Sequence, residues 1–125
     1  MREGAVKVLD DDNLEFVDLL HSLGVQRNVA KVITYLAGSG EVTSREIERG
    51  TDMRQPEVSI AMRTLRRENW VHEWEVKSGG NGRPSKVYTL ITPLDEIIRS
   101  IEDEKRKKSA EAMERIQKLK DLASG

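Results

Sequence analysis

Apolar residues recur at helical spacing over the first third of the chain, up to a glycine-containing break at residues 38–40. They predict two amphipathic helices, the first capped by Asn13 and stopped by Gly24, the second spanning residues 26–37. The apolar positions are Leu14, Val17, Leu20 and Leu23, followed by Val29, Val32, Ile33 and Leu36. Residues 1–12 lack this periodicity, so we expect them to form a flexible arm.

A short helix, a turn and a longer helix are expected next. Thr43 or Ser44 can cap a helix over residues 45–49, which Ile47 anchors in the core, and residues 50–53 form the turn. The longer helix spans residues 55–68, with Pro56 in its first turn and Asn69 in the left-handed position after its end. Its apolar face consists of Val58, Met62 and Leu65, with Ala61 beside them.

Two alternating segments, residues 71–77 and 86–90, predict a β-hairpin with a glycine-rich loop at residues 78–84. Trp74 and Val76 alternate with polar residues in the first strand, and Tyr88 and Leu90 in the second. The expected fold is therefore mainly α with a small β-hairpin. The order helix, turn, helix and hairpin is that of a winged helix-turn-helix, whose second helix usually enters the DNA major groove.

The last predicted helix begins after Thr92-Pro93 and reaches about Ala123. A charged segment at residues 102–108 separates its apolar ends, and residues 94–123 carry eight positive and eight negative side chains. Either this helix is solvated and docked by one end, or it packs against a second copy. We favour a homodimer, because a small domain offers too few partners for so long a helix. The expected dimer contacts are Leu94, Ile98, Ile101, Ala112, Ile116, Leu119 and Ala123.

Length and composition place a winged helix-turn-helix domain at residues 13–92 and the dimerisation helix at residues 93–125 of this 125-residue chain. The absence of cysteine excludes disulfides and thiolate metal sites, and fits a cytoplasmic protein. We expect no signal peptide and no membrane span. The histidines, His21 and His72, lack ligand spacing, and no nucleophile–base pair is present. We therefore expect neither a metal nor another cofactor, and no enzymatic activity.

Charge is unevenly distributed along a chain whose net charge is −1. Residues 1–23 carry two cations against six carboxylates, whereas residues 54–67 carry four arginines against Glu57. The positive surplus therefore falls on the second helix of the predicted helix-turn-helix. Such a surplus favours contact with phosphates there, while the acidic residues elsewhere limit non-specific binding to DNA.

The outer face of this second helix carries candidate DNA-reading side chains. Gln can pair with adenine, Arg with guanine, and Ile60 can pack on a thymine methyl group. Arg83 and Lys86 bracket Pro84 at the hairpin loop and suit phosphate or minor-groove contact. The alternatives are a solvated helix face and an ordinary surface hairpin. The full candidate set is Ser44, Arg54, Gln55, Pro56, Ser59, Ile60, Arg63, Arg66, Arg67, Arg83 and Lys86.

Three segments resemble known regulators. Residues 54–59, Arg-Gln-Pro-Glu-Val-Ser, resemble the start of recognition helices in ArsR-like repressors. Residues 23–71 resemble the N-terminal domain of archaeal TrmB-like and MarR-like regulators, and residues 82–90 are similar to a frequent wing pattern in such proteins. Arg54 replaces a frequent Ser cap, Ile60 a frequent Arg and Asp52 a turn glycine. These departures imply a lost cap hydrogen bond, an altered base preference and a left-handed Asp52.

The pattern and the resemblance together imply a transcriptional regulator that binds double-stranded DNA as a homodimer. Its two recognition helices would lie about one DNA turn apart on a roughly palindromic site. The alternative is a protein-interaction module that uses the winged fold as a scaffold and its last helix as the binding surface. The dependence of binding affinity on salt concentration distinguishes the two functions, because DNA binding releases counterions and weakens steeply as salt rises.

Overall fold

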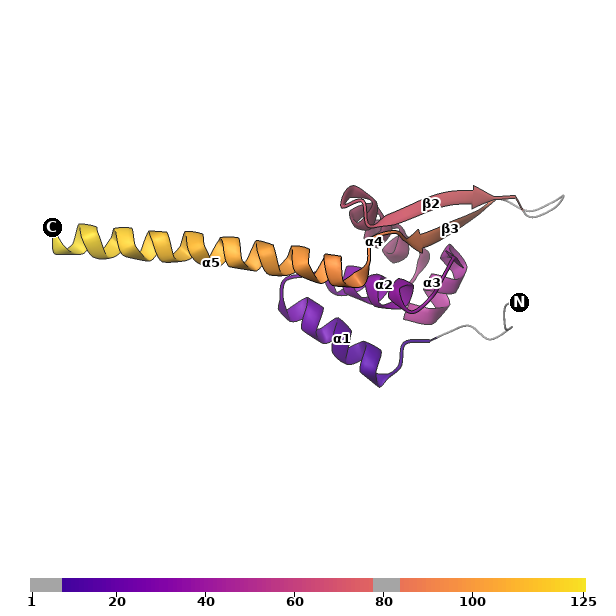
Figure 1. The fold of residues 1–125 in the computed structure, drawn as a ribbon. Coiled ribbons are helices and arrows are strands. Elements are labelled where there is room, and N and C mark those ends of the chain that lie inside the picture. The colour runs from indigo at the N-terminus through magenta and orange to yellow at the C-terminus, as the bar shows by residue number, and fades with distance from the viewer. Residues whose placement is uncertain (1–7, 78–83) are drawn as a thin grey trace. The chain divides into compact units, whose positions relative to one another are not determined.

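The computed structural model describes residues 8–77 and 84–125. The helices and strands, in chain order, are α1 (Asp11–Ser22), α2 (Arg27–Ala37), β1 (Val42–Thr43), α3 (Ser44–Thr51), α4 (Gln55–Arg67), β2 (Val71–Val76), β3 (Ser85–Leu90) and α5 (Leu94–Ser124). Figure 1 shows these elements along the chain. They form two compact units, one ending at Pro93 and the other spanning Leu94–Gly125. No helix within the described residues has the length and apolar character that a membrane span requires.

The core of the first unit is built around α2, which packs against α1, α3 and α4. The apolar faces predicted for α2, α3 and α4 are confirmed, since their residues are buried in this core. Buried side chains contributed by these helices are Val29, Val32, Ile33, Leu36, Ile47, Val58, Ala61, Met62 and Leu65. Burial of these faces holds α4 in place and leaves its opposite face to solvent.

The predicted apolar face of α1 is only half correct. Val17 and Leu20 are buried, whereas Leu14 and Leu23 are 41% and 46% exposed. Successive positions in this set are three residues apart, and each step of three residues falls about 60° short of a full helical turn. Leu14 and Leu23 therefore lie on roughly opposite sides of the helix, and only the two middle residues can face α2.

The start of α1 also differs from the prediction, because Asp10 and not Asn13 is the N-cap. The Asp10 carboxylate accepts from the Asn13 backbone N–H at 2.8 Å, and the Asn13 side chain accepts from the Asp10 N–H at 3.0 Å. This reciprocal pair begins the helix at Asp11. The Leu9 N–H also donates to the Gly50 carbonyl at 3.2 Å. Residues 9–12 of the predicted arm are thus tied to the domain, and residues 1–7 lie outside the described residues.

The helix α3 is longer than predicted, running from Ser44 to Thr51. Thr43 caps it through a reciprocal pair of hydrogen bonds with Glu46, at 3.1 and 2.8 Å. The predicted turn therefore shrinks to residues 52–54, with Asp52 in the left-handed conformation at φ 55°. The expected left-handed Asn69 is confirmed at φ 62°. The helix α4 ends at Arg67, one residue before the predicted end.

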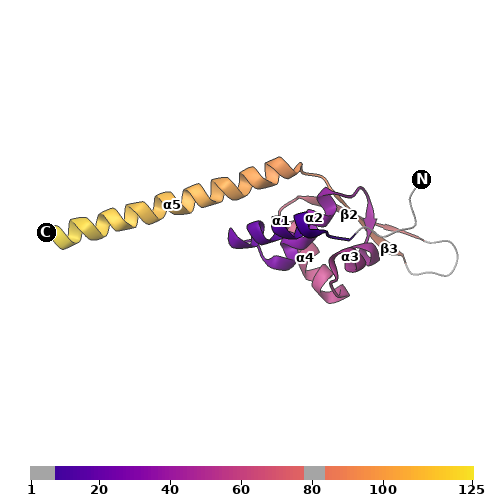
Figure 2. The same cartoon turned by 90° about the horizontal axis from the view of Figure 1, so that it is seen from below.

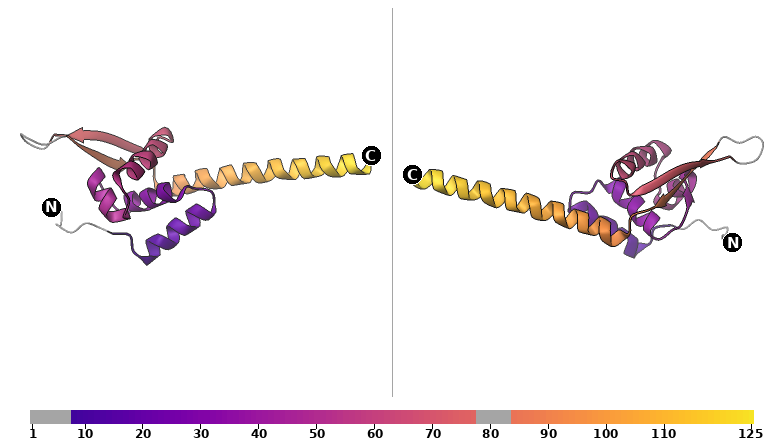
Figure 3. Two further views of the ribbon diagram at one scale, coloured as in Figure 1. Left: turned by 180° about the vertical axis from the view of Figure 1, so that it is seen from behind. Right: turned by 45° about the horizontal axis from the view of Figure 1, so that its top comes forward.

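The three strands form an antiparallel sheet in the order β1-β3-β2, which makes β3 the central strand. Each strand of the β2–β3 hairpin differs from its predicted bounds by one residue, and the register pairs Val71 with Leu90 and Val76 with Ser85. In the views of Figures 2 and 3 the hairpin extends past the helices of its unit. Val71 and Tyr88 are buried on one face of the sheet, which places the hairpin against α4.

Candidate nucleic-acid interface

The outer face of α4 is the first part of the candidate interface. Opposite the buried Val58, Met62 and Leu65, Ile60 is 53% exposed, and Arg63 and Arg67 are also exposed. The side chains of Gln55 and Ser59 flank this face, joined by a hydrogen bond of 2.8 Å from Gln55 Nε2 to Ser59 Oγ. The helix therefore combines an apolar back with an exposed front of short polar residues and arginines, as a major-groove helix requires.

The first turn of α4 is capped although Arg54 stands where similar recognition helices often have serine. Arg54 occupies the N-cap position without a side-chain cap bond, as expected from the substitution. Its backbone N–H donates instead to Glu57 Oε1 at 2.9 Å. Pro56 lies in the first turn, where the backbone N–H groups have no partner within the helix. The exposed Arg54 side chain is thus not needed to cap the helix.

A groove with a volume of about 640 Å³ lies beside the start of α4. It brings together three predicted residues from separate elements, namely Ser44 at the start of α3, Gln55 at the start of α4 and Lys86 near the start of β3. The complete lining is Thr43, Ser44, Arg45, Glu48, Gln55, Pro84, Ser85 and Lys86. Two cations and several hydroxyl or amide groups against one carboxylate suit a groove that receives phosphates.

The groove adds Arg45 to the candidate set. Arg45 follows Ser44 directly and is exposed at the first turn of α3, but it lies ten residues before α4 in the sequence. It therefore lies outside the basic surplus of residues 54–67. A signal was nevertheless present, since a cation beside a helix cap can reach a phosphate that the helix N-terminus also attracts. The other predicted wing residue, Arg83, lies outside the described residues.

Arg66 differs from the other arginines of α4. Its Nη1 atom lies 3.2 Å from Glu73 Oε2 on β2, and the Glu73 side chain is only 18% exposed. The prediction grouped Arg66 with residues that read DNA. The structure places its guanidinium against the sheet, within an ion pair that the sequence spacing did not reveal.

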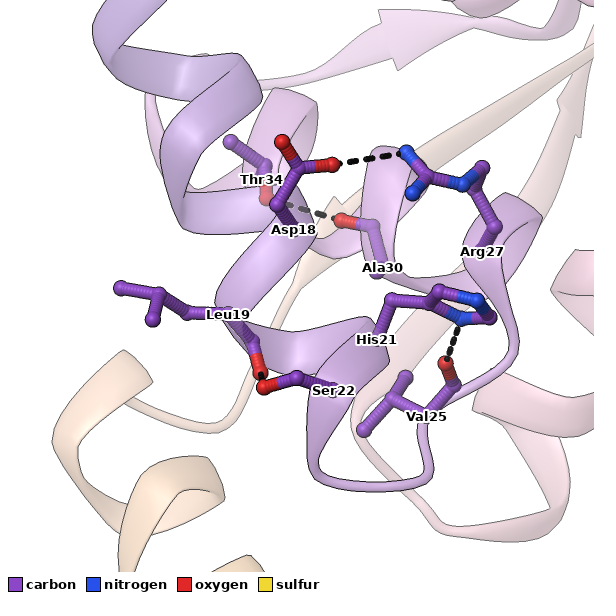
Figure 4. Close-up of polar contacts among 8 residues, drawn as sticks. All are labelled: Asp18, Leu19, His21, Ser22, Val25, Arg27, Ala30 and Thr34. Carbon is purple, nitrogen blue, oxygen red and sulfur yellow. Dashed lines mark hydrogen bonds and ion pairs between the residues drawn. The ribbon is translucent and has the colours of Figure 1, made fainter.

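The two histidines lie in separate local environments. Figure 4 shows His21 at the end of α1 pointing toward the Val25 carbonyl, 3.1 Å from Nδ1. Beside it, Asp18 pairs with Arg27 at 2.9 Å across the α1–α2 connection. His72 instead stacks on Trp74, with ring centroids 5.2 Å apart. Among the described residues, no three His, Cys, Asp or Glu side chains gather as a group that could hold a metal ion.

The second unit, α5, is a single helix of 31 residues with exposed apolar side chains. Of the predicted dimer contacts, Ile98 and Ile116 are each 44% exposed and Leu119 is 67% exposed. Leu94 and Ile101 are half-buried, and Ala112 and Ala123 are exposed. Three ion pairs of the i,i+4 type, Glu102–Arg106, Glu104–Lys108 and Glu111–Arg115, run along the helix surface.

Solved structures described as transcriptional regulators have folds similar to that of this chain. No protein-family model matches the sequence, and no curated protein matches it. A solved structure of a possible transcriptional regulator from Methanosarcina mazei Go1 superposes with a TM-score of 0.59 at 14% identity, covering 86% of this chain and 87% of that one. A transcriptional regulator homologue from Pyrococcus horikoshii OT3 gives 0.51 at 19% identity, covering 79% and 96%.

A third similar structure is MepR, a transcription regulator of the Staphylococcus aureus multidrug efflux pump MepA. Its TM-score is 0.50 at 19% identity, covering 90% of this chain and 85% of MepR. At such identities the likeness establishes the fold. The expectation drawn from the sequence is confirmed at the level of the fold, and the chain has a winged helix-turn-helix fold similar to those of these solved regulators.

Proposed function

We propose that this chain is a sequence-specific DNA-binding transcriptional regulator that acts as a homodimer. The observation that carries the proposal is the juxtaposition, in one domain, of the exposed arginine face of α4 and a cation-lined groove at the starts of α3, α4 and β3. A helix in the major groove and cations beside it on the backbone are the two kinds of contact that DNA recognition combines.

The residues divide into two roles. Arg63 and Gln55, on the exposed front of α4, suit base edges, since Arg pairs bidentately with guanine and Gln with adenine. Ser44, Arg45 and Lys86, which line the groove, suit phosphates. Glu48 in the same groove offsets part of the positive charge there, so we expect non-specific binding to be weak at physiological salt.

The apolar side chains of α5 support dimerisation through this helix. The helix is about 46 Å long at ~1.5 Å per residue, and a single helix has no interior in which to bury an apolar face. Ala112, Ile116, Leu119 and Ala123 repeat at spacings of four, three and four residues, as in a coiled-coil seam. Toward the N-terminus this stripe passes through Ser109 and Lys105 before it reaches Ile101 and Ile98. We therefore place the main dimer contact in the C-terminal third of α5.

A selection of bound duplexes from a random-sequence pool, followed by a salt titration on the selected DNA, tests this function. We expect the selected sequences to share an inverted repeat with half-sites about 10 base pairs apart. The logarithm of the association constant should fall linearly with the logarithm of salt concentration, because bound cations displace counterions. Failure to bind any duplex at low salt would refute the proposal and favour the protein-interaction module.

A further inference from the structure

Three side chains from three elements meet where α4 packs against the hairpin. Arg66 comes from α4, Glu73 from β2 and Tyr88 from β3, and we call this group the Arg66–Glu73–Tyr88 clamp. The guanidinium of Arg66 lies 3.2 Å from the Glu73 carboxylate. Glu73 and Tyr88 are direct cross-strand partners, so their side chains share one face of the sheet and the carboxylate lies near the Tyr88 hydroxyl.

The carboxylate of the clamp is more shielded from solvent than any partner in the Asp18–Arg27 pair or in the three ion pairs of α5, although the Arg66 side chain is 48% exposed. The Glu73 side chain is 18% exposed, whereas in each remaining pair both partners are at least 44% exposed. Tyr88 is buried, and its burial, followed by the nearby Glu73 carboxylate, raises the pKa of its hydroxyl well above the usual range. Like any tyrosine hydroxyl at neutral pH it is protonated, so it can act as a donor. A carboxylate shielded in this way is costly to leave unpaired, so the three groups hold one another in place.

The clamp lies on the β2 side of the hairpin, whereas on the other side β3 is held by its pairing with β1. Residues 68–70 alone connect α4 to β2, and Asn69 in this connection has the left-handed conformation. The pairing of β3 with β1 holds the base of the hairpin, while β2 is an edge strand of the sheet. Glu73, three residues beyond the turn, ties this edge strand to α4, so the direction of the hairpin relative to α4 is held on the β2 side as well as through β1.

The same face of the hairpin carries a candidate phosphate contact. Lys86 is paired across the strands with Glu75. This pair lies two residues along each strand from the Glu73–Tyr88 pair, toward the loop. Residues separated by two positions in a strand lie on the same face. The direction that the clamp imposes on β3 is therefore the direction in which Lys86 is presented to the groove beside α4.

We propose that Arg66 is a positioning residue and not a DNA contact: through Glu73 and Tyr88 it fixes the wing relative to α4, so that Lys86 reaches the DNA backbone when α4 lies in the major groove. This inference rests on the proposed function. It reassigns one arginine of the predicted DNA-reading face and gives Glu73, a carboxylate, a favourable part in binding DNA.

The inference and simple electrostatics make opposite predictions for Glu73→Gln. Removing a negative charge close to DNA should by itself raise affinity, since it reduces repulsion of phosphates. If the clamp positions the wing, the same substitution lowers affinity because Lys86 loses its contact. The salt slope then becomes shallower by about 0.9, the contribution of one phosphate. In a Lys86→Ala background, Glu73→Gln should have no further effect, because the contact it controls is already absent.

The experiment measures fluorescence anisotropy of a duplex that the unmodified chain has selected from a random pool. The variants are Glu73→Gln, Arg66→Gln, their double mutant, and each single substitution combined with Lys86→Ala. We expect Glu73→Gln and Arg66→Gln to weaken binding equally, by the same factor as Lys86→Ala, and the double mutant to be no weaker than either single variant. Glu75→Gln, with the same change of charge on the same strand and face, is the matched control and should not weaken binding.

Each result either supports or overturns the inference. Glutamine at position 73 keeps the size of the side chain and an oxygen for the Tyr88 hydroxyl, and thermal unfolding verifies that each variant is folded at the assay temperature. If Glu73→Gln binds as tightly as the unmodified chain or more tightly, the positioning role is wrong while the proposed function stands. A shallower slope in Arg66→Gln alone would make Arg66 a direct phosphate contact. If the unmodified chain selects no duplex, the proposed function fails and the inference with it.

Discussion

Lys86→Ala is the most direct quantitative test of the interface. Lys86 is exposed near the start of β3 and lines the groove with Ser44, Arg45 and Gln55. If its ammonium group neutralises one phosphate, its removal makes the plot of log association constant against log salt shallower by about 0.9. A fourfold rise in salt, for example from about 50 to about 200 mM, then reduces the advantage of the unmodified chain over the variant by about 3.5-fold, which is four raised to the power 0.9.

The assay is fluorescence anisotropy with one selected duplex over a series of salt concentrations. Lys118→Ala on α5 is the matched control, because it removes the same charge from an exposed helix surface distant in the sequence from the groove. Its slope should equal that of the unmodified chain. Equal slopes for Lys86→Ala and the unmodified chain would refute the phosphate contact. Adding Arg83→Ala should extend the loss in slope to as much as about two, if both wing cations contact the backbone.

Three further predictions address base reading, assembly and folding. Arg63→Ala should weaken binding and relax the preference at one base pair by about 1–3 kcal/mol, with little change in thermal stability; unchanged affinity for every duplex tested would remove Arg63 from the reading face. Ile116→Asp with Leu119→Asp should give a folded monomer by sedimentation, since unpaired carboxylates are not tolerated in an apolar seam, and an unchanged dimer would place the interface elsewhere. Thr43→Ala should lower the unfolding free energy by about 1 kcal/mol in urea denaturation, because its hydroxyl accepts from the Glu46 N–H at 3.1 Å; full stability would mean that this cap contributes nothing.

Much of α4 could be predicted from the sequence because its signals are local. The spacing of Val58, Met62 and Leu65 defines a face on any α-helix, and these residues are buried as expected. The left-handed Asp52 and Asn69 follow from the conformations that short polar side chains tolerate next to a helix end. Strand alternation likewise predicted the hairpin to within one residue of each strand's bounds.

The spacing of apolar residues gave a wrong prediction for part of α1, because a buried face requires all its positions to lie on the same side of the helix. The three-residue steps from Leu14 to Leu23 suggested one apolar face on α1, but helical geometry turns the two ends away from each other. The predicted N-cap of α1, Asn13, was also wrong, because two neighbouring residues can both act as caps. Both Asp10 and Asn13 are good cap residues, and the reciprocal hydrogen bonds between them decide which one begins the helix.

The tertiary structure alone decided which distant residues act together. The sequence by itself determined the order of the elements, the buried face of α4 and the cations of its exposed face, since these depend on repeats of a few residues. The groove joins Arg45 to Lys86, and the clamp joins Arg66 to Glu73 and Tyr88. Such contacts depend on how α3, α4 and the hairpin pack, and packing is set by the summed burial of many side chains. An arginine on a helix therefore reads the same in the sequence whether it faces DNA or holds a wing in place.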